Sequence, residues 1–388
     1  MFSMDPPFTP EHQMFRRTLR DYVEKELAPH ALEWDEAGIF PREVFRGLAE
    51  IGALGINYPE SVGGAGGDYW YVVVLAEELV GTRNSGVNMG VLVQSQMATP
   101  IIQEIGTDEQ KKEFLIPALA GEKIGALGIS EPDAGSDVAN LRTTARRVGD
   151  DYVINGAKMW ITNSLQADWM CLLANTSEGV AHKNKSLIMV PMTTPGVTKA
   201  KKIRKIGMMS SDTGLIHFDD VRVPQTNRIG EEGLGFTYQM MQFQEERLWA
   251  AAHAIQALLN TIQQTADFAR ERQIFGMSVL DHQVCHYKLA ELKTEVESLR
   301  GLVYMATEKY VAGADVTEWA SMAKLKACRL GRLVPDACMQ HWGGMGYTWE
   351  NRVSRLYRDG RLASIGGGAD EVMLGIIGKY MHVLPGKR

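Results

Sequence analysis

The sequence predicts an α+β protein in which a β-rich region separates two helical regions. Residues 10–123 follow helical apolar spacing, and residues 124–228 break into short β-like runs. The segment 236–273 contains neither glycine nor proline, as a very long helix requires. At 388 residues the chain exceeds one ordinary core. We expect an N-terminal all-helical domain over 1–123, a middle β domain over 124–235 and a C-terminal four-helix bundle over 236–388.

The N-terminal region begins with a clear helix signal. Thr9 is a capping residue, Pro10 suits the first helical position, and HQMFRRTLRDYVEKEL continues with a helical apolar period. The later segment SVGGAGGDYW is a glycine loop between helices. It lacks the GxGxxG spacing and follows no strand, so it is weak evidence for dinucleotide binding.

The middle region reads as a set of strands separated by turns. The runs are ALGIS, TTARRV, DYVING, WMCLLAN, SLIMVPM and LIHFDDVRV, with turn residues such as Gly149-Asp150-Asp151 between them. No long helix lies between these runs, so a parallel βαβ sheet is disfavoured. An antiparallel barrel or sandwich is expected instead.

The C-terminal region should contain three long helices, at about 236–273, 283–311 and 317–342. Seven glycines then follow within Gln340–Val372, in a segment otherwise rich in helix formers. Glycine destabilises helices, so such clusters indicate loops where the backbone closely approaches another group.

Charge and composition exclude some functions. Lys plus Arg number 41 against 47 for Asp plus Glu, which argues against nucleic acid as a main partner. The basic run 199–205 is interrupted by apolar residues and is more typical of a solvated strand face than of a site for CoA phosphate or a partner protein. The four cysteines form no CxxC pair, which indicates reduced thiols, and we expect no metal site.

No segment reaches the roughly 20 apolar residues that span a bilayer. The N-terminus has neither an apolar signal core nor the composition of a transit peptide. We therefore expect a cytoplasmic bacterial protein or, in a eukaryote, a processed protein of the mitochondrial matrix.

Five motifs stand in a fixed order along the chain. They are LGISEPDAGSD from Leu127, NGAKMWITNS from Asn155, RERQIFGMSVLDHQ from Arg270, Gln340 with Gly343-Gly344, and Tyr357-Arg358-Asp359 leading to IGGGADE at 365–371. Each motif alone also fits a plain strand, turn or helix cap. Together, on this helix–β–helix background, they resemble the acyl-CoA dehydrogenase family of FAD enzymes, and most closely its branched-chain isovaleryl-CoA and citronellyl-CoA type.

The resemblance implies which residues bind FAD and substrate. Those matched to FAD lie in all five motifs: Leu127, Ile129, Ser130, Ser136, Trp160, Ile161, Thr162, Arg272, Phe275, Gln283, Gln340, Gly343, Gly344, Ala369 and Glu371. Arg272, Phe275 and Gln283 match residues that bind the FAD of a neighbouring subunit. Residues matched to the acyl-CoA are Ser136, Gln244, Glu245, Arg247, Gly367 and Gly368.

The catalytic base is expected on the long helix and not in the glycine-rich loop. Many family members carry a catalytic glutamate at the position of Gly367, and the common threonine two residues on is Ala369 here. In the isovaleryl-type subgroup the glutamate lies on the long helix before an arginine, which matches Glu246-Arg247. A solvated Glu245-Glu246 pair is the alternative, but the following run LWAAAHAIQALL is too apolar for an exposed helix. We favour Glu246 over Glu245, whose side chain points about 100° away.

The predicted activity is FAD-dependent α,β-dehydrogenation of an acyl-CoA to the trans-2-enoyl-CoA. By resemblance, Glu246 removes the α-proton while the β-hydride passes to flavin N5. The substrate is a medium-chain or branched acyl-CoA, since the triple glycine leaves room for a methyl branch or, alternatively, gives only loop flexibility. An acyl-CoA oxidase and a non-catalytic acyl-CoA or flavin-binding module are the competing functions. Electron-transfer flavoprotein is the expected electron acceptor and a homotetramer the expected assembly.

Overall fold

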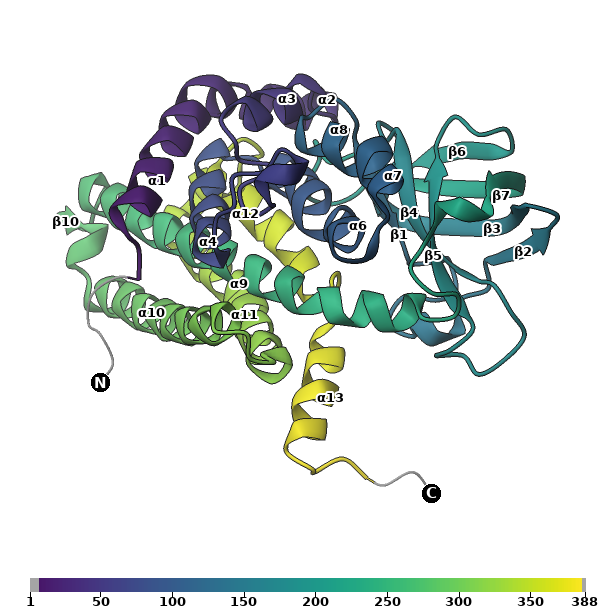
Figure 1. The fold of residues 1–388 in the computed structure, drawn as a ribbon. Coiled ribbons are helices and arrows are strands. Elements are labelled where there is room, and N and C mark those ends of the chain that lie inside the picture. The colour runs from purple at the N-terminus through teal and green to yellow at the C-terminus, as the bar shows by residue number, and fades with distance from the viewer. Residues whose placement is uncertain (1–6, 386–388) are drawn as a thin grey trace.

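The computed structural model describes residues 7–385 and shows helical, β and helical regions in that order (Figure 1). This confirms the predicted fold class. The N-terminal helices are α1 (Pro10–Tyr22), α2 (Ala31–Ala37), α3 (Glu43–Glu50), α4 (Tyr69–Glu78), α5 (Ser85–Leu92), α6 (Pro100–Ile105), α7 (Asp108–Gln110) and α8 (Ile116–Leu119). Thr9 caps α1 in a capping box with His12, as its sequence signal predicts.

The middle region forms one sheet with the strand order β6-β7-β3-β2-β4-β5-β8, and β1 pairs with β4. Its strands are β1 (Gly125–Gly128), β2 (Thr144–Val148), β3 (Asp151–Thr162), β4 (Trp169–Asn175), β5 (Lys185–Pro191), β6 (Val197–Lys202), β7 (Thr213–Pro224) and β8 (Arg228–Ile229). Most pairings are antiparallel as expected, but β4 pairs in parallel with β1 and β2. Residues 199–202 of the basic run lie in exposed edge strand β6, as a solvated strand face predicts, whereas residues 203–205 follow the strand, and Ile203 and Lys205 there are partly buried.

Three long helices dominate the C-terminal region: α9 (Gly235–Glu271), α10 (Gln283–Val311) and α11 (Thr317–Trp342). The predicted bounds of α10 and α11 are correct, and those of α9 differ by one residue at its start and two at its end. A hairpin that was not predicted, β9 (Gln273–Ile274) with β10 (Met277–Ser278), follows α9. Helices α12 (Arg352–Gly360) and α13 (Asp370–Tyr380) complete the chain, and α13 projects from the body (Figure 1).

The two helical regions share one hydrophobic core. Leu48 and Leu75 from the N-terminal helices lie in the same buried cluster as Leu248, Val296 and Val334 from the long helices. The sheet has a core of its own. Helix α9 therefore belongs to the centre of the molecule, and its 37 residues extend from the sheet to the opposite end, where β10 lies (Figure 1).

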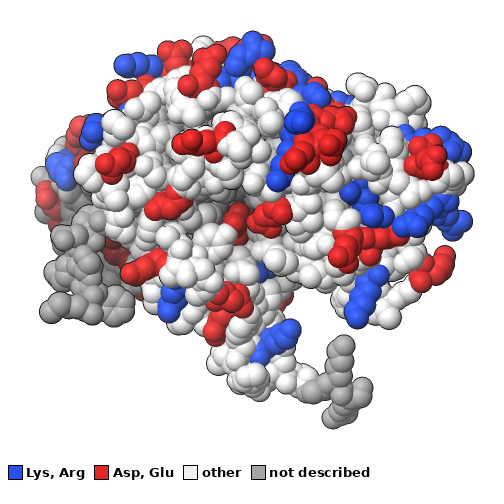
Figure 2. Space-filling view, in the orientation of Figure 1, with Lys and Arg blue, Asp and Glu red and all other residues white. Residues whose placement is uncertain are grey.

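The structure also bears on four features considered in the sequence: a membrane span, a metal site, the cysteines and the surface charge. Within residues 7–385 no helix combines the length and apolar character that crossing a bilayer requires. The same part of the chain contains no group of three His, Cys, Asp or Glu residues placed to hold a metal ion. All four cysteines are buried and unpaired. Basic and acidic side chains mix over the visible surface, so neither sign dominates it (Figure 2).

Candidate active site

Glu246 lies on α9 in the interior of the protein. Its side chain is 6% exposed, and its Oε1 atom has no hydrogen-bond partner. Burial raises the pKa of Glu246 to about 8; the adjacent Arg247 opposes this shift, and Glu245 adds to it. A buried carboxylate with a free oxygen and a pKa near neutrality has the properties of a general base.

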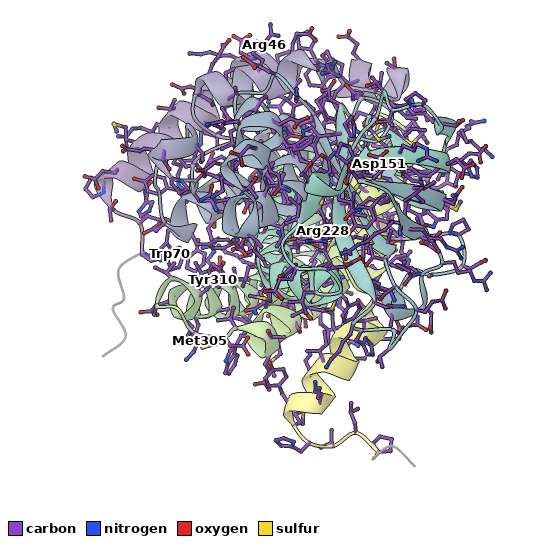
Figure 3. The ribbon with its side chains drawn as sticks, turned by 45° about the vertical axis from the view of Figure 1, so that its right-hand side comes forward. Arg46, Trp70, Asp151, Arg228, Met305 and Tyr310 are labelled. Carbon is purple, nitrogen blue, oxygen red and sulfur yellow. The ribbon has the colours of Figure 1, made fainter. Side chains whose placement is uncertain are left out.

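Glu245 points elsewhere, as the helical spacing predicts. It lines a cavity of about 530 Å³ together with Tyr69, Glu104 and Tyr310. The hydroxyl of Tyr310, which is labelled in Figure 3, donates to Glu245 Oε1. Burial raises the pKa of Glu245 to about 7, and this hydrogen bond opposes the shift. Glu245 therefore has a fixed structural partner, whereas Oε1 of Glu246 remains free.

The residues beside the two glutamates connect α9 to α11. Arg247 is 7% exposed, and its Nη1 lies 3.5 Å from Ser321 Oγ on α11. Gln244 Oε1 accepts a 3.2 Å hydrogen bond from the backbone N–H of Val316, just before α11. Neither contact blocks Glu246. Among the predicted substrate residues, Gln244 is thus bound to protein, and Ser136 is exposed on a loop.

The first two motifs come together at the edge of the sheet. The N–H of Met159 donates to the carbonyl of Ser130 at 2.9 Å, which joins the segment after β1 to β3. A buried ion pair at 2.9 Å between Lys158 and Glu131 fixes the same segment. Leu127, Ile129 and Ile161 are buried beneath this edge.

Trp160 is the unusual residue of this edge. It occupies an irregularity in the β3–β7 pairing, has φ +67° and is 55% exposed. Such strain in a non-glycine residue concentrates at functional sites. Trp160 follows Met159, whose N–H binds the Ser130 carbonyl. It also precedes Thr162 by two residues, so an exposed flat ring lies at the edge that carries two hydroxyl residues. Such a set of side chains fits the ring of the expected flavin.

The third and fourth motifs lie at the other end of α9. Arg272, Phe275 and Gln283 are exposed just before, within and after the β9–β10 hairpin, and Phe275 is 94% exposed with φ +48°. The 26 positions from Glu246 to Arg272 correspond to about 39 Å along a helix. These residues cannot reach the Glu246 site of the same chain. The end of α11 lies with them, because Trp342 stacks on Phe268 and donates to Thr265 at 3.0 Å.

Glycine backbones in the fourth and fifth motifs are accessible. A Cβ atom at Gly343, Gly344 or Gly367 would meet nothing within 4 Å. Gln340 is exposed beside the first two of these glycines. At Gly367 the backbone has φ +61°, which disfavours any side chain despite the open space. The backbone N–H groups there can therefore approach a ligand closely.

The glycine loop Gly366–Gly368 is held by a residue that the sequence reasoning missed. Lys324 of α11 is 3% exposed, and its ammonium group donates to the carbonyls of Ala363, Gly366 and Gly368. A lysine on the apolar face of a helix that also carries Ala320, Ala323 and Ala327 was the available signal. Beyond the loop, Ala369 precedes α13 and Glu371 is exposed in its first turn.

Comparisons with known proteins agree on one family. Models of the N-terminal, middle and C-terminal domains of acyl-CoA dehydrogenase match residues 9–122, 126–221 and 233–382. The chain is 37% identical to the mitochondrial long-chain specific acyl-CoA dehydrogenase of Mus musculus over 377 residues, covering 96% of this chain and 87% of the relative.

Two solved structures show the same likeness in three dimensions. Butyryl-CoA dehydrogenase from Megasphaera elsdenii is 33% identical with a TM-score of 0.93, covering 98% of this chain and 100% of the other. A glutaryl-CoA dehydrogenase from Mycobacterium smegmatis in complex with FADH2 is 29% identical with a TM-score of 0.91, covering 100% and 98%.

Proposed function

The chain belongs to the acyl-CoA dehydrogenase family, and on that premise we propose that Glu246 is the base that removes the α-proton of the acyl-CoA substrate. As a member of this family it is a flavin-linked oxidoreductase that uses FAD to dehydrogenate acyl-CoA thioesters. The observation that carries the proposal is the buried Glu246 carboxyl group, whose Oε1 has no partner and whose pKa is about 8.

The flavin supplies the acceptor for the two electrons of the β-hydride. The chain supplies the groups that acidify and remove the α-proton. An α-proton beside a thioester carbonyl is weakly acidic, so developing charge on the carbonyl oxygen must be stabilised as the proton leaves. The accessible N–H of Gly367 is the donor we assign to that oxygen. Ionised Glu246 then takes the proton and the product is the trans-2-enoyl-CoA.

The surroundings of Glu246 determine the pH at which it is ionised and can act as a base. Burial keeps its carboxyl group protonated below about pH 8, and Arg247 limits the increase in its pKa. An acyl chain that excludes further water disfavours the ionised form more strongly. The Arg247 guanidinium is thus part of the proposed machinery, because without it the carboxylate would be harder to form.

The proposed substrate is a medium-chain or branched acyl-CoA. Open space around Gly367 and the absence of side chains at 366–368 leave room for a methyl branch at the β-carbon. Two relatives are named for long and short chains, and neither name mentions a branch, so the branch is specific to this proposal. Straight and 3-methyl acyl-CoAs of matched chain length distinguish a straight-chain substrate from a branched one. A clear preference for the straight chain would contradict the proposed branched substrate.

The proposed assembly is a homo-oligomer, most simply a tetramer, with electron-transfer flavoprotein as electron acceptor. The separation of about 39 Å between Glu246 and Arg272 supports an FAD site that two subunits complete. One chain would supply Trp160 and Thr162, and its neighbour would supply Arg272 and Phe275. Exposed aromatic and arginine side chains at that distant end are consistent with such sharing.

Single-turnover reduction of the flavin tests the base. Holoenzymes carrying Glu246→Gln or Glu245→Gln are mixed anaerobically with octanoyl-CoA, and the loss of oxidised flavin absorbance is followed. We expect Glu246→Gln to slow reduction by about 10²- to 10⁴-fold, the usual effect of losing a general base. Glu245→Gln is the comparison variant: Glu245 is matched to acyl-CoA binding and not to proton removal, so its rate of flavin reduction at saturating octanoyl-CoA should stay near that of the wild type. Wild-type reduction by Glu246→Gln at full FAD content would disprove the assignment.

The same assay separates the competing functions. An oxidase would reduce its flavin and then form peroxide in air at the rate of turnover. A non-catalytic binding module would bind acyl-CoA without flavin reduction by any chain length. Efficient turnover with electron-transfer flavoprotein and little peroxide is the result that we expect.

A further inference from the structure

We propose that Lys324 is a positioning residue that orients the backbone N–H of Gly367 toward the thioester carbonyl of the substrate. The inference rests on the proposed function, in which that N–H stabilises the carbonyl oxygen. It concerns a residue outside the five motifs and outside the substrate and flavin contacts assigned above.

The ammonium group of Lys324 is fully occupied by backbone carbonyls of the segment 363–368, which includes the glycine loop. It donates to the carbonyl oxygens of Ala363 at 2.8 Å and Gly366 at 3.0 Å, and also to that of Gly368. A lysine ammonium has three N–H donors, so all three are directed at backbone carbonyls of one short segment. The side chain is 3% exposed, so water does not compete for these donors. Lys324 therefore fixes the conformation of the loop from beneath.

The geometry of the peptide bond converts this contact into an orientation. In a trans peptide the C=O of one residue and the N–H of the next lie in one plane and point in opposite directions. The carbonyl of Gly366 and the N–H of Gly367 belong to the same peptide unit. Because Lys324 holds the carbonyl of Gly366, the N–H of Gly367 must point away from Lys324. Gly367 is exposed and a Cβ built on it would meet nothing within 4 Å, so we assign its N–H to the open side of the loop.

Glycines make this orientation dependent on an external support. Gly366, Gly367 and Gly368 have more backbone freedom than any other residue type, and Gly367 and Gly368 have φ values of +61° and +90°. Without a contact that selects one conformation, the N–H of Gly367 would sample many directions. Preorganised donors are effective because they need not reorient during the reaction. Lys324 supplies that preorganisation.

The position of Lys324 links the loop to the base. Ser321, one helical turn before it on α11, lies 3.5 Å from Arg247, the neighbour of Glu246. Burial lowers the pKa of Lys324, Cys328 and Asp370 oppose this shift, and the positive charge of Arg247 adds to it. Helix α11 therefore holds the glycine loop level with the segment of α9 that carries Glu246. The proposed oxyanion donor and the proposed base are positioned by one helix pair.

The test replaces Lys324 and reads the carbonyl that the loop should polarise. Lys324→Met removes the three donors and keeps most of the stem, and Lys324→Gln keeps a shorter polar group. Lys326→Met is the control, because Lys326 lies on the same helix but pairs with Glu295 at the surface at 2.6 Å. Each change is made alone for kinetics and together with Glu246→Gln for spectroscopy, so that the bound thioester stays intact.

Two readouts are measured at full FAD occupancy. The first is kcat and KM with octanoyl-CoA. The second is the infrared stretching frequency of the carbonyl of bound octanoyl-CoA labelled with ¹³C at C1. We expect Lys324→Met to lower kcat about 10- to 100-fold, less than the 10²- to 10³-fold loss of a whole oxyanion donor, with a much smaller change in KM. The carbonyl frequency should rise toward that of free octanoyl-CoA. Lys326→Met should change neither.

The outcomes separate this inference from the proposed function. A wild-type kcat and carbonyl frequency in Lys324→Met, or in Lys324→Gln if only that variant folds, would overturn the role of Lys324. A lower melting temperature with an unchanged carbonyl frequency would also overturn it, because it indicates support of the fold alone. Failure of Glu246 as base would appear instead as turnover by the single Glu246→Gln variant, whatever Lys324 does.

Discussion

Replacing Glu246 by glutamine should stabilise the protein increasingly as the pH rises. Burial raises the pKa of Glu246 from an ordinary value of 4.5 to about 8 in the folded protein. The group is therefore protonated more readily when folded than when unfolded. Its contribution to stability is fully present below pH 4.5 and is lost progressively until the pH exceeds about 8. Glutamine has no charge to bury, so the Glu246→Gln variant does not lose this stability as the pH rises.

The size of the effect follows from the pKa difference. Each pH unit between 4.5 and 8 removes about 1.4 kcal/mol of stability from the wild type. The glutamine variant should therefore gain about 2 kcal/mol over the wild type at pH 6 and about 5 kcal/mol at pH 9. The additional 3 kcal/mol corresponds to roughly 4 °C in melting temperature for a chain of this length.

Melting temperatures of the two holoenzymes, at one protein concentration and one excess of FAD, measure this difference at several pH values. The Glu245→Gln variant provides a comparison, because the pKa of Glu245 is about 7 and its gain should level off one pH unit earlier. A melting-temperature difference between Glu246→Gln and wild type that stays constant from pH 6 to pH 9 would refute the reasoning. It would mean that Glu246 is ionised as easily in the folded protein as in water.

Three further results follow from the site. The kcat/KM for flavin reduction should rise with pH and level off above about 8, since Glu246 must be ionised in the free enzyme; a flat profile would contradict this. Trp160→Ala should fold normally but weaken FAD binding about tenfold in a titration, because an exposed indole is lost from the flavin wall; unchanged affinity would exclude that contact. Gly367→Ala should destabilise the protein by about 1 kcal/mol through its φ of +61° and lower kcat less than tenfold, since the N–H remains. A kcat loss in Gly367→Ala as large as that in Glu246→Gln would argue against a backbone role.

Most of the fold could be predicted because local signals were strong. The long helices α9, α10 and α11 lack helix-breaking residues over most of their length and are separated by turn residues, so their limits are visible in the sequence. The pairing of the strands could not be predicted in the same way. The parallel contact of β1 with β4 joins segments about 45 residues apart, and only tertiary packing specifies it.

The site residues likewise fall into two groups: those that local sequence signals predict and those whose surroundings depend on tertiary packing. The helical spacing of Glu245 and Glu246 correctly predicts that the two carboxyl groups face different surroundings, which the cavity beside Glu245 shows. The strain and exposure of Trp160 could not be predicted, because a tryptophan in a strand usually belongs to the core. Lys324 was missed because a single lysine in a helix normally faces water. Its partners lie about 40 residues later, in a loop whose path depends on the packing of α11.

Exchange of the α-hydrogens of bound acyl-CoA with solvent tests the central role of Glu246 most directly. Each enzyme is incubated in D₂O without oxygen, with a substrate analogue whose β-carbon carries no hydrogen, such as 3,3-dimethylbutyryl-CoA, and deuterium at the α-carbon is measured by mass spectrometry. Wild type and Glu245→Gln should incorporate deuterium, and Glu246→Gln should incorporate none beyond the uncatalysed rate. Incorporation by Glu246→Gln at the wild-type rate would show that another group removes the α-proton.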